Sequence, residues 1–392
     1  MSNMIMGERA GQYDFGLAAE QEQRARDIHE RSIVIDLLFQ GPLSPSVIPA
    51  EVSEQLKAEC EPLKDDPMAY AMLPSKRLRQ MSARRELAAF KDEWYRSGIT
   101  AGNREVDLSS HESIMTSMGE VQEQFDRTDW LIKALSAADI RRAKAEGLKA
   151  GIVTTQDPTG LGKNLELLEA LHSFGLRIAQ LTYNNQNAIA SGCMELANGG
   201  VSNFGMTFIR RMNELRIIVD TSHCGKQTTL DACRLSDAPV IASHTGVEAI
   251  YPHRRCKSDE ELRAIAETGG VIGVFAMPWF VHEDPKNTTI DHVLDHIDYI
   301  VKLVGVDHVG IGTDWPMSDV DWSLVYFKEH IAPKLGFAKG DGPSTELVRG
   351  LEQYGLFMNF TRGLVARGYS DEEVGKIIGG NWLRVFEQVW GS

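Results

Sequence analysis

The chain has 392 residues, 43% of them hydrophobic, and is long enough to bury a large core. Its 41 Lys and Arg residues against 55 Asp and Glu residues give a formal net charge of −14, which argues against nucleic acid and anionic membrane surfaces as partners. Five cysteines without CxxC spacing predict reduced thiols. The N-terminus lacks the apolar core of a signal peptide, and no apolar run approaches the ~20 residues that cross a bilayer, so we expect a cytoplasmic protein.

The first hundred residues contain one predicted strand between helical segments. Residues 17–31 are rich in helix formers, and the β-branched residues of 32–39 favour a strand. Residues 50–97 are charged and helical in composition, and no linker-like composition flanks them. Three prolines are expected to break this segment: Pro62, Pro67 and Pro74. We therefore interpret residues 50–97 as a helical insertion and residues 1–392 as a single domain.

From about residue 98 short apolar runs alternate regularly with amphipathic segments. The predicted strands begin at 98, span 148–155 and 177–183, end at His223 and at His244, and span 270–276 and 308–314. The predicted helices are 113–145, 162–174, 203–214, 226–236, 258–268 (with Ser258 and Glu261 as a capping box) and 289–304. Together with the strand at 32–39, eight strands alternate with helices, which predicts an α/β fold, a (β/α)8 TIM barrel. C-terminal helices at 345–368 and 371–389 should cover the barrel.

Two of these strands end in Ser-His, followed by Gly two residues later. The histidines, His223 and His244, are 21 positions apart, which is about one strand-helix-strand step. Because parallel strands end at the same edge of a sheet, the two side chains should meet where barrel enzymes carry out their chemistry. Neutral imidazole is the commonest protein metal ligand, so the pair predicts half or more of a zinc-type site. The alternative is that each histidine is a hydrogen-bonded structural residue.

Charged residues follow the eighth strand and the strand of His244. Asp314 ends the eighth strand and could take a proton from an attacking water, or else cap the next turn. Arg254 and Arg255 follow the strand of His244, and an arginine is suited to a bidentate grip on a substrate carboxylate. A surface ion pair is the alternative for these two arginines.

Eight segments, in order along nearly the whole chain from about residue 30, share a pattern with a known family. They are LTYN at 181–184, Gly192, DTSH at 220–223, PVIASH at 239–244, RCKSDE at 255–260, GGVIGV at 269–274, DHVGIGTD at 307–314 and GGNWLRVF at 379–386. With these segments the chain resembles the renal (membrane) dipeptidase family of the amidohydrolase superfamily. Members of that family use two zinc ions bridged by a glutamate and cleave dipeptides, often with a D-residue at the C-terminal side.

The resemblance implies roles for individual residues. It places the second zinc site on His223 and His244 and the acid/base aspartate on Asp314. The arginine that meets the substrate carboxylate falls on Arg254 or Arg255, with Arg255 favoured. The family's substrate-binding histidine corresponds to Tyr183, which we expect to take part in catalysis. Members of the family are often dimers, so the resemblance also leaves a homodimer open.

The chain departs from the family at the metal ligands. The family's first strand carries Asp-x-His-x-Asp, whereas here Leu38 and Gln40 follow Asp36. The bridging glutamate corresponds to Gln156, which we interpret as a substrate-binding residue. Leucine cannot ligate a metal, and a neutral amide is a poorer partner for a divalent cation than a carboxylate. We therefore expect no binuclear site, and at most one divalent metal ion, preferably zinc.

Three functions are compatible with these residues. The first is a divergent dipeptidase-like hydrolase that cleaves an amide or related bond of a small carboxylate-bearing substrate with at most one metal ion. The second is a metal-independent acid/base enzyme, such as an isomerase, a lyase or a biosynthetic tailoring enzyme, because histidine titrates near neutral pH. The third is a binding protein without turnover. Metal content separates the first from the others, and ligand-induced stabilisation without turnover would identify the third.

Overall fold

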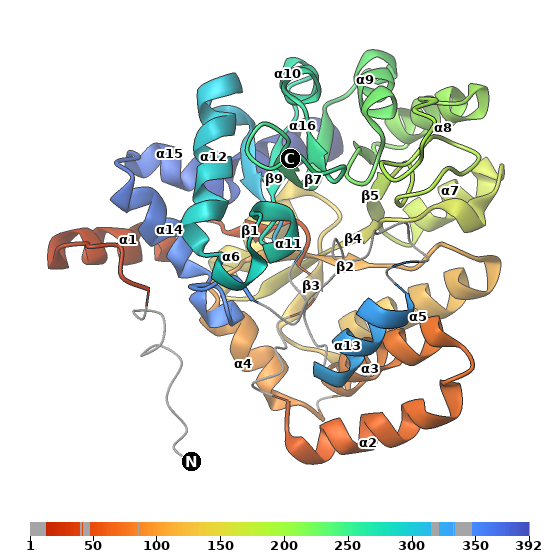
Figure 1. Cartoon of the computed structure of the whole chain (residues 1–392), viewed down its shortest axis with the longest axis horizontal. Coiled ribbons are helices and arrows are strands. Elements are labelled where there is room, and N and C mark those ends of the chain that lie inside the picture. The colour runs from red at the N-terminus through yellow and green to blue at the C-terminus, as the bar shows by residue number, and fades with distance from the viewer. Residues whose placement is uncertain are drawn as a thin grey trace.

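The computed structural model describes residues 13–39, 41, 48–84, 86–314, 321–331, 333 and 347–391. Eight parallel strands follow one another around the sheet (Figure 1). In sheet order they are β1 (Ile35–Asp36), β2 (Ala101–Glu105), β4 (Lys149–Thr155), β5 (Leu176–Gln180), β6 (Ile218–Asp220), β7 (Val240–Val247), β9 (Ile272–Val274) and β10 (Val309–Ile311). The amide of Leu37 donates to the carbonyl of Ile311 at 3.1 Å, so β10 returns to β1. The predicted (β/α)8 TIM barrel is confirmed.

The two histidine strands end at different points from those predicted. β6 ends at Asp220, three residues before His223, whereas β7 continues through His244 to Val247. The continuation has a tertiary cause, because a two-residue strand, β8 (Cys256–Lys257), pairs with β7 at Gly246 and Val247. β9 also pairs with β7, at Thr245, so the two similar Ser-His pairs differ in the strands that their neighbours supply.

Amphipathic helices surround the strands. Each helix buries its one apolar face against the sheet. In α12 (Ile290–Val304) the buried residues Ile290, Val293, Leu294 and Ile297 recur at helical spacing. The capping box predicted for α10 (Asp259–Glu267) is present, since the Ser258 amide donates to Glu261 Oε2 at 2.9 Å. Three more helices follow strands: α7 (Leu165–Ser173), α8 (Asn203–Glu214) and α9 (Lys226–Leu235).

The prediction of one long helix over 113–145 is wrong. The segment contains α5 (His111–Arg127), a short strand β3 (Leu131–Lys133) and α6 (Ala137–Glu146). β3 pairs with β4, with Leu131 opposite Lys149, and this pairing competes successfully with helix propensity. The Ser136 hydroxyl, which accepts from the Asp139 amide, starts α6 and was the one local signal of a break.

The insertion is helical, as predicted, and consists of α2 (Ala50–Cys60), α3 (Pro67–Ala83) and α4 (Ala88–Arg96). Pro67 stands at the start of α3, where a missing amide hydrogen is tolerated, but Pro74 lies inside α3 and does not break it, contrary to prediction. Helix α13 (Asp321–His330) packs on α3, with the rings of Tyr70 and Tyr326 centred 4.0 Å apart. In Figure 1, α2, α3 and α13 form a layer at the lower right.

The C-terminal helices are shorter than predicted. Of the described residues in 345–368 only α14 (Met358–Ala366) is α-helical, and it packs on α1 (Ala19–Arg31). The second segment contains α15 (Asp371–Gly375), a π-helical turn and α16 (Asn381–Trp390). The indole of Trp382 donates to the carbonyl of Ile311 at 3.1 Å, so α16 covers the barrel beside β10, as predicted. A Cβ atom on Gly310 would come within 2.5 Å of this indole, which explains the glycine.

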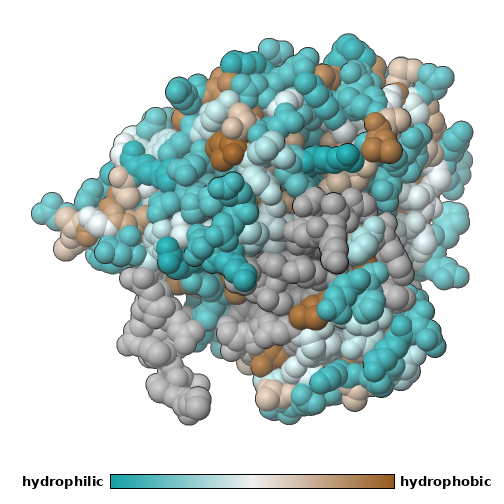
Figure 2. All heavy atoms as spheres, in the orientation of Figure 1, coloured by the Kyte–Doolittle hydropathy of each residue, from teal (hydrophilic) through white to brown (hydrophobic). Residues whose placement is uncertain are grey.

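The surface seen in Figure 2 is mainly hydrophilic, with apolar side chains as scattered spots, as expected for this charge. Within the described part of the chain, none of the helices combines the length and the apolar character that crossing a bilayer requires.

Candidate active site

His223 and His244 lie side by side at the C-terminal edge of the barrel. Their Nε2 atoms are 2.9 Å apart, and the two side chains are 5% and 0% exposed. Burial, followed by the positive charge of Arg255, holds the pKa of both imidazoles well below 6.5. Both rings are therefore neutral at physiological pH, which is the form that can bind a metal ion.

Hydrogen bonds orient both rings through their other nitrogens. Nδ1 of His223 lies 2.7 Å from Asn184 Oδ1, and Nδ1 of His244 lies 2.9 Å from the Ser243 hydroxyl. That hydroxyl donates to Asp220 at 2.5 Å, so its oxygen is left to accept from His244. Because both Nδ1 atoms carry the ring hydrogen, both Nε2 atoms have a free lone pair, and these two atoms are 2.9 Å apart. This arrangement fits a shared cation, either a proton or a metal ion.

The backbone around the site is strained. Among the described residues four non-glycine residues have positive φ, and three of them belong to this site: Asn184 at 60°, His223 at 60° and Asp314 at 51°. Such conformations cost about 1 kcal/mol or more each and persist where the surrounding structure imposes them. The strain is therefore concentrated where the chain presents side chains to the barrel mouth.

Arg255 is a buried cation with no hydrogen-bond partner in the described part of the chain. It is 1% exposed, none of its three guanidinium nitrogens donates to another described residue, and its guanidinium carbon lies 5.9 Å from the ring centre of Phe275 and 5.8 Å from that of Phe280. A buried charge of this kind needs a counter-charge. Arg254, in contrast, is exposed and donates to the carbonyl of Met194 at 3.0 Å. The structure thus separates the two arginines that the sequence left together.

Tyr183 stacks on His223, with ring centres 4.2 Å apart and an interplanar angle of 25°. Burial, and then the negative charge of Asp314, raises the pKa of its phenol. The hydroxyl therefore keeps its proton and can donate a hydrogen bond to a ligand.

The other half of the rim carries Asp314, Leu38, Glu105 and Gln156, which follow or end the successive strands β10, β1, β2 and β4. The amide of Asp314 donates to the carbonyl of Leu38 at 3.2 Å. Gln156 Nε2 donates to Glu105 Oε2 at 3.0 Å. Burial raises the pKa of Glu105 to about 7. The sequence reasoning missed Glu105, although its place at the end of a barrel strand was the signal that could have identified it.

A binuclear metal site does not fit these residues. Leu38 is buried and apolar, and the amide nitrogen of Gln156 points at Glu105, while Gln40 lies outside the described residues. Among the described residues, no group of three or more His, Cys, Asp or Glu side chains is placed to hold a metal ion. The converging Nε2 atoms of His223 and His244 fit one cation, with the remaining ligands supplied by water or substrate.

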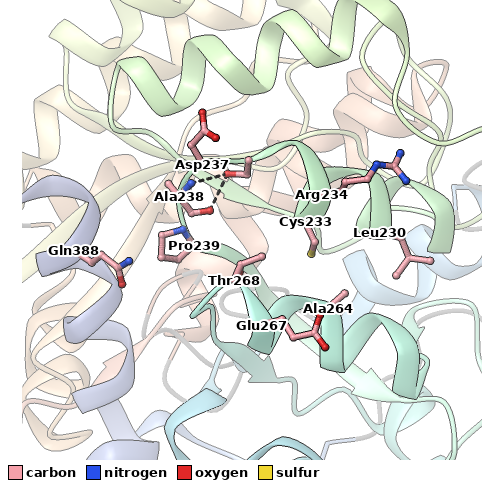
Figure 3. A pocket seen from close by; sticks show the side chains of 11 residues that line it. Leu230, Cys233, Arg234, Asp237, Ala238, Pro239, Ala264, Glu267, Thr268 and Gln388 are labelled. Atoms are coloured by element: carbon pink, nitrogen blue, oxygen red, sulfur yellow. Dashed lines mark hydrogen bonds between the residues drawn. The ribbon is translucent and has the colours of Figure 1, made fainter.

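A hollow of about 560 Å³ lies elsewhere, between α9, α10 and α16 (Figure 3). Its lining includes Pro239, which precedes β7, and Thr268, which precedes β9. These residues stand at the N-terminal ends of the strands, whereas the histidines stand at the C-terminal ends. The hollow is therefore separate from the candidate active site.

Comparisons with known proteins agree with this architecture. The chain is 29% identical over 264 residues to dipeptidase tcpJ of Claviceps purpurea, a match that covers 67% of this chain and only 56% of that protein. It is 28% identical over 265 residues to an uncharacterised protein in the pqqA 5' region of Klebsiella pneumoniae, covering 65% of this chain and 88% of the relative.

Two solved structures share the fold. An amidohydrolase from Pseudomonas aeruginosa is 28% identical with a TM-score of 0.72, covering 94% of this chain and 99% of its own. The probable dipeptidase PvdM from the same organism is 19% identical with a TM-score of 0.68, covering 95% and 99%. Finally, residues 22–323 match the model of the membrane dipeptidase family, peptidase family M19. The chain belongs to the membrane dipeptidase family.

Proposed function

We propose that this protein hydrolyses an amide or related bond in a small substrate that carries a carboxylate. The observation that carries the proposal is the buried guanidinium of Arg255, which has no described hydrogen-bond partner and lies close enough to His223 and His244 to lower the pKa of both. A guanidinium can bind a carboxylate through two parallel hydrogen bonds. A substrate held there would place its neighbouring bond over the histidine pair.

The remaining residues suit the later steps. Asp314 would take the proton of the attacking water. The Tyr183 hydroxyl, which keeps its proton, would donate to the oxygen of the bond under attack. Gln156 would contact the substrate through its amide oxygen, because its amide nitrogen is engaged by Glu105. A single divalent cation on His223 and His244 would supply Lewis-acid polarisation and lower the pKa of bound water.

Metal content tests this proposal first. Protein purified without a metal-binding tag should contain about one zinc, manganese or iron per chain by elemental analysis. His223→Ala should lose that metal, because it removes one of the two converging nitrogens, whereas the exposed control His111→Ala should keep it. Hydrolysis of a panel of dipeptides and other amides should be lost together with the metal. Absence of metal even in excess zinc would contradict the one-metal hydrolase.

A metal-independent acid/base enzyme is the second candidate. The observation in its favour is that the rim retains two carboxyl groups, Glu105 and Asp314, where the binuclear ligands are absent. This candidate predicts turnover that survives prolonged treatment with a strong chelator. The one-metal hydrolase predicts that the chelator abolishes turnover and that added zinc restores it.

A further inference from the structure

Glu105 is a carboxylic acid at the rim of the candidate site to which no role has been assigned so far. It is the last residue of β2, next in the sheet to β4, and it accepts a hydrogen bond from Gln156. The side chain is only part-buried, so a ligand in the barrel mouth can reach it. Only Oε2 has a hydrogen bond among the described residues, which leaves Oε1 available for a substrate.

Glu105 and Asp314 flank β1 on neighbouring strands of the same rim. The sheet order β10–β1–β2 places Asp314 on one side of Leu38 and Glu105 on the other. Leu38 offers no polar atom, and the structure therefore presents two carboxyl groups separated by an apolar side chain. Paired carboxyl groups can divide the work of an acid and a base when only one of them carries a proton.

We propose that Glu105 is a catalytic residue of this site and donates the proton to the leaving amine, opposite Asp314 as the base. This inference rests on the proposed hydrolase function and assigns a step of it. Water attacks the carbonyl carbon of the amide while Asp314 takes one proton from that water. The C–N bond then breaks, and the nitrogen takes the proton of Glu105. The products are a carboxylic acid and an amine, and the proton held by Asp314 returns to Glu105 through solvent.

The surroundings of Glu105 suit a proton donor. Burial raises its pKa to about 7, and the hydrogen bond from Gln156 opposes this effect, as does the positive charge of Arg79 on α3. The negative charges of Asp314 and Asp107 act in the same direction as burial. The charge of Glu105 contributes to the raised pKa of the nearby Tyr183 phenol, which stays neutral. A substantial fraction of Glu105 is therefore protonated near neutral pH, while its conjugate base remains easy to form.

The direct test compares the whole chain with its variant Glu105→Gln. The matched control is Glu166→Gln, which changes an exposed glutamate of α7. Glutamine keeps the shape and can still accept the hydrogen bond from Gln156, so the fold should be retained. Infrared spectra taken between about pH 5 and pH 9 should show a protonated carboxyl band in both the wild type and the control. This band should be missing from the spectra of Glu105→Gln. Identical bands in all three proteins would overturn the inference.

Kinetics then test the assigned step. The two probes are L-alanyl-D-alanine, whose leaving amine is basic, and L-alanyl-3-carboxy-4-nitroanilide, which also carries a carboxylate but has a leaving amine that needs little protonation. Because a positioned general acid contributes about 10²–10⁴-fold, Glu105→Gln should lower kcat on the dipeptide by at least about 100-fold. The loss on the anilide should be at least about tenfold smaller.

The outcomes separate this inference from the proposed function. Equal losses on both probes, or no loss on either, would contradict the proton-donor role while leaving amide hydrolysis standing. Failure of the wild type to cleave any amide would contradict the proposed function, and the inference with it.

Discussion

Two buried cations lie two residues apart in the chain and have opposite surroundings. Lys257 is 3% exposed, donates to the carbonyl of Cys224 at 3.0 Å and to the hydroxyl of Thr229 at 2.6 Å, and pairs with Glu261 at 3.0 Å. Arg255 is equally buried, yet its guanidinium donates to no described residue. An uncompensated buried charge is costly, so we expect the compensated Lys257 to stabilise the fold and propose that Arg255 meets the charge of a ligand. The hydrogen-bond partners of a buried charge thus indicate its role better than its depth.

The largest effect is expected from Lys257→Met. Removing the lysine leaves Glu261 buried without its counter-ion, which should lower the free energy of unfolding by about 3–5 kcal/mol. Urea denaturation followed by circular dichroism measures this loss. The control is Lys226→Met, which breaks an exposed pair with Glu260 of almost the same length, 2.9 Å, and should cost less than about 1 kcal/mol. Similar losses in the two variants would contradict the structural role of Lys257.

Arg255→Met should give the reverse pattern. Without the guanidinium, a charge-assisted contact worth about 1.5–3 kcal/mol is lost. The value of kcat/KM for carboxylate-bearing amides should therefore fall roughly 10- to 150-fold. The free energy of unfolding should stay the same or rise, since a buried cation without a described partner has been replaced by an apolar side chain. Steady-state kinetics and urea denaturation measure the two quantities. If Arg255→Met lowered the free energy of unfolding as much as Lys257→Met does, Arg255 would be a residue that stabilises the fold.

The smallest effect is a pH dependence at the Lys257–Glu261 pair. Burial alone would raise the pKa of Glu261, but Lys257 and hydrogen bonds from Ser258 outweigh it and lower that pKa. A lowered folded-state pKa adds stability above the unfolded value of about 4.3, and this contribution is lost as pH falls through the folded-state pKa. The stability gap between wild type and Lys257→Met should therefore narrow in acid. The difference in free energy of unfolding between the wild type and Lys226→Met should change little with pH. If the difference for Lys257→Met were also independent of pH, this would contradict the pairing of Lys257 with Glu261.

Much of the fold was predictable from local patterns. The strands were recognisable because buried parallel strands are continuous apolar runs, and α8 has the predicted bounds, residues 203–214. The strand β3 was not recognisable, since Trp130–Leu135 contains no residue that stops a helix and becomes extended only by pairing with β4. Pro74 was also misjudged, since it lies inside α3 without ending the helix.

The candidate site was predictable only in part. The spacing of His223 and His244 placed them together, because two parallel strands joined by a helix end at one edge of a sheet. Glu105 was missed because nothing in its local sequence indicates that Gln156, which directly follows the next strand of the sheet, will bond to it. Its importance depends on a neighbour about fifty residues away in the chain.

The sequence by itself determined the barrel and the histidine pair, because strand periodicity is local, and it predicted that no binuclear site forms, because a leucine at position 38 cannot ligate a metal in any fold. Only the tertiary structure decided which of Arg254 and Arg255 is the buried cation and brought Glu105 against Gln156. Burial and hydrogen bonding are properties of neighbours in space, and for these residues the neighbours come from distant parts of the chain.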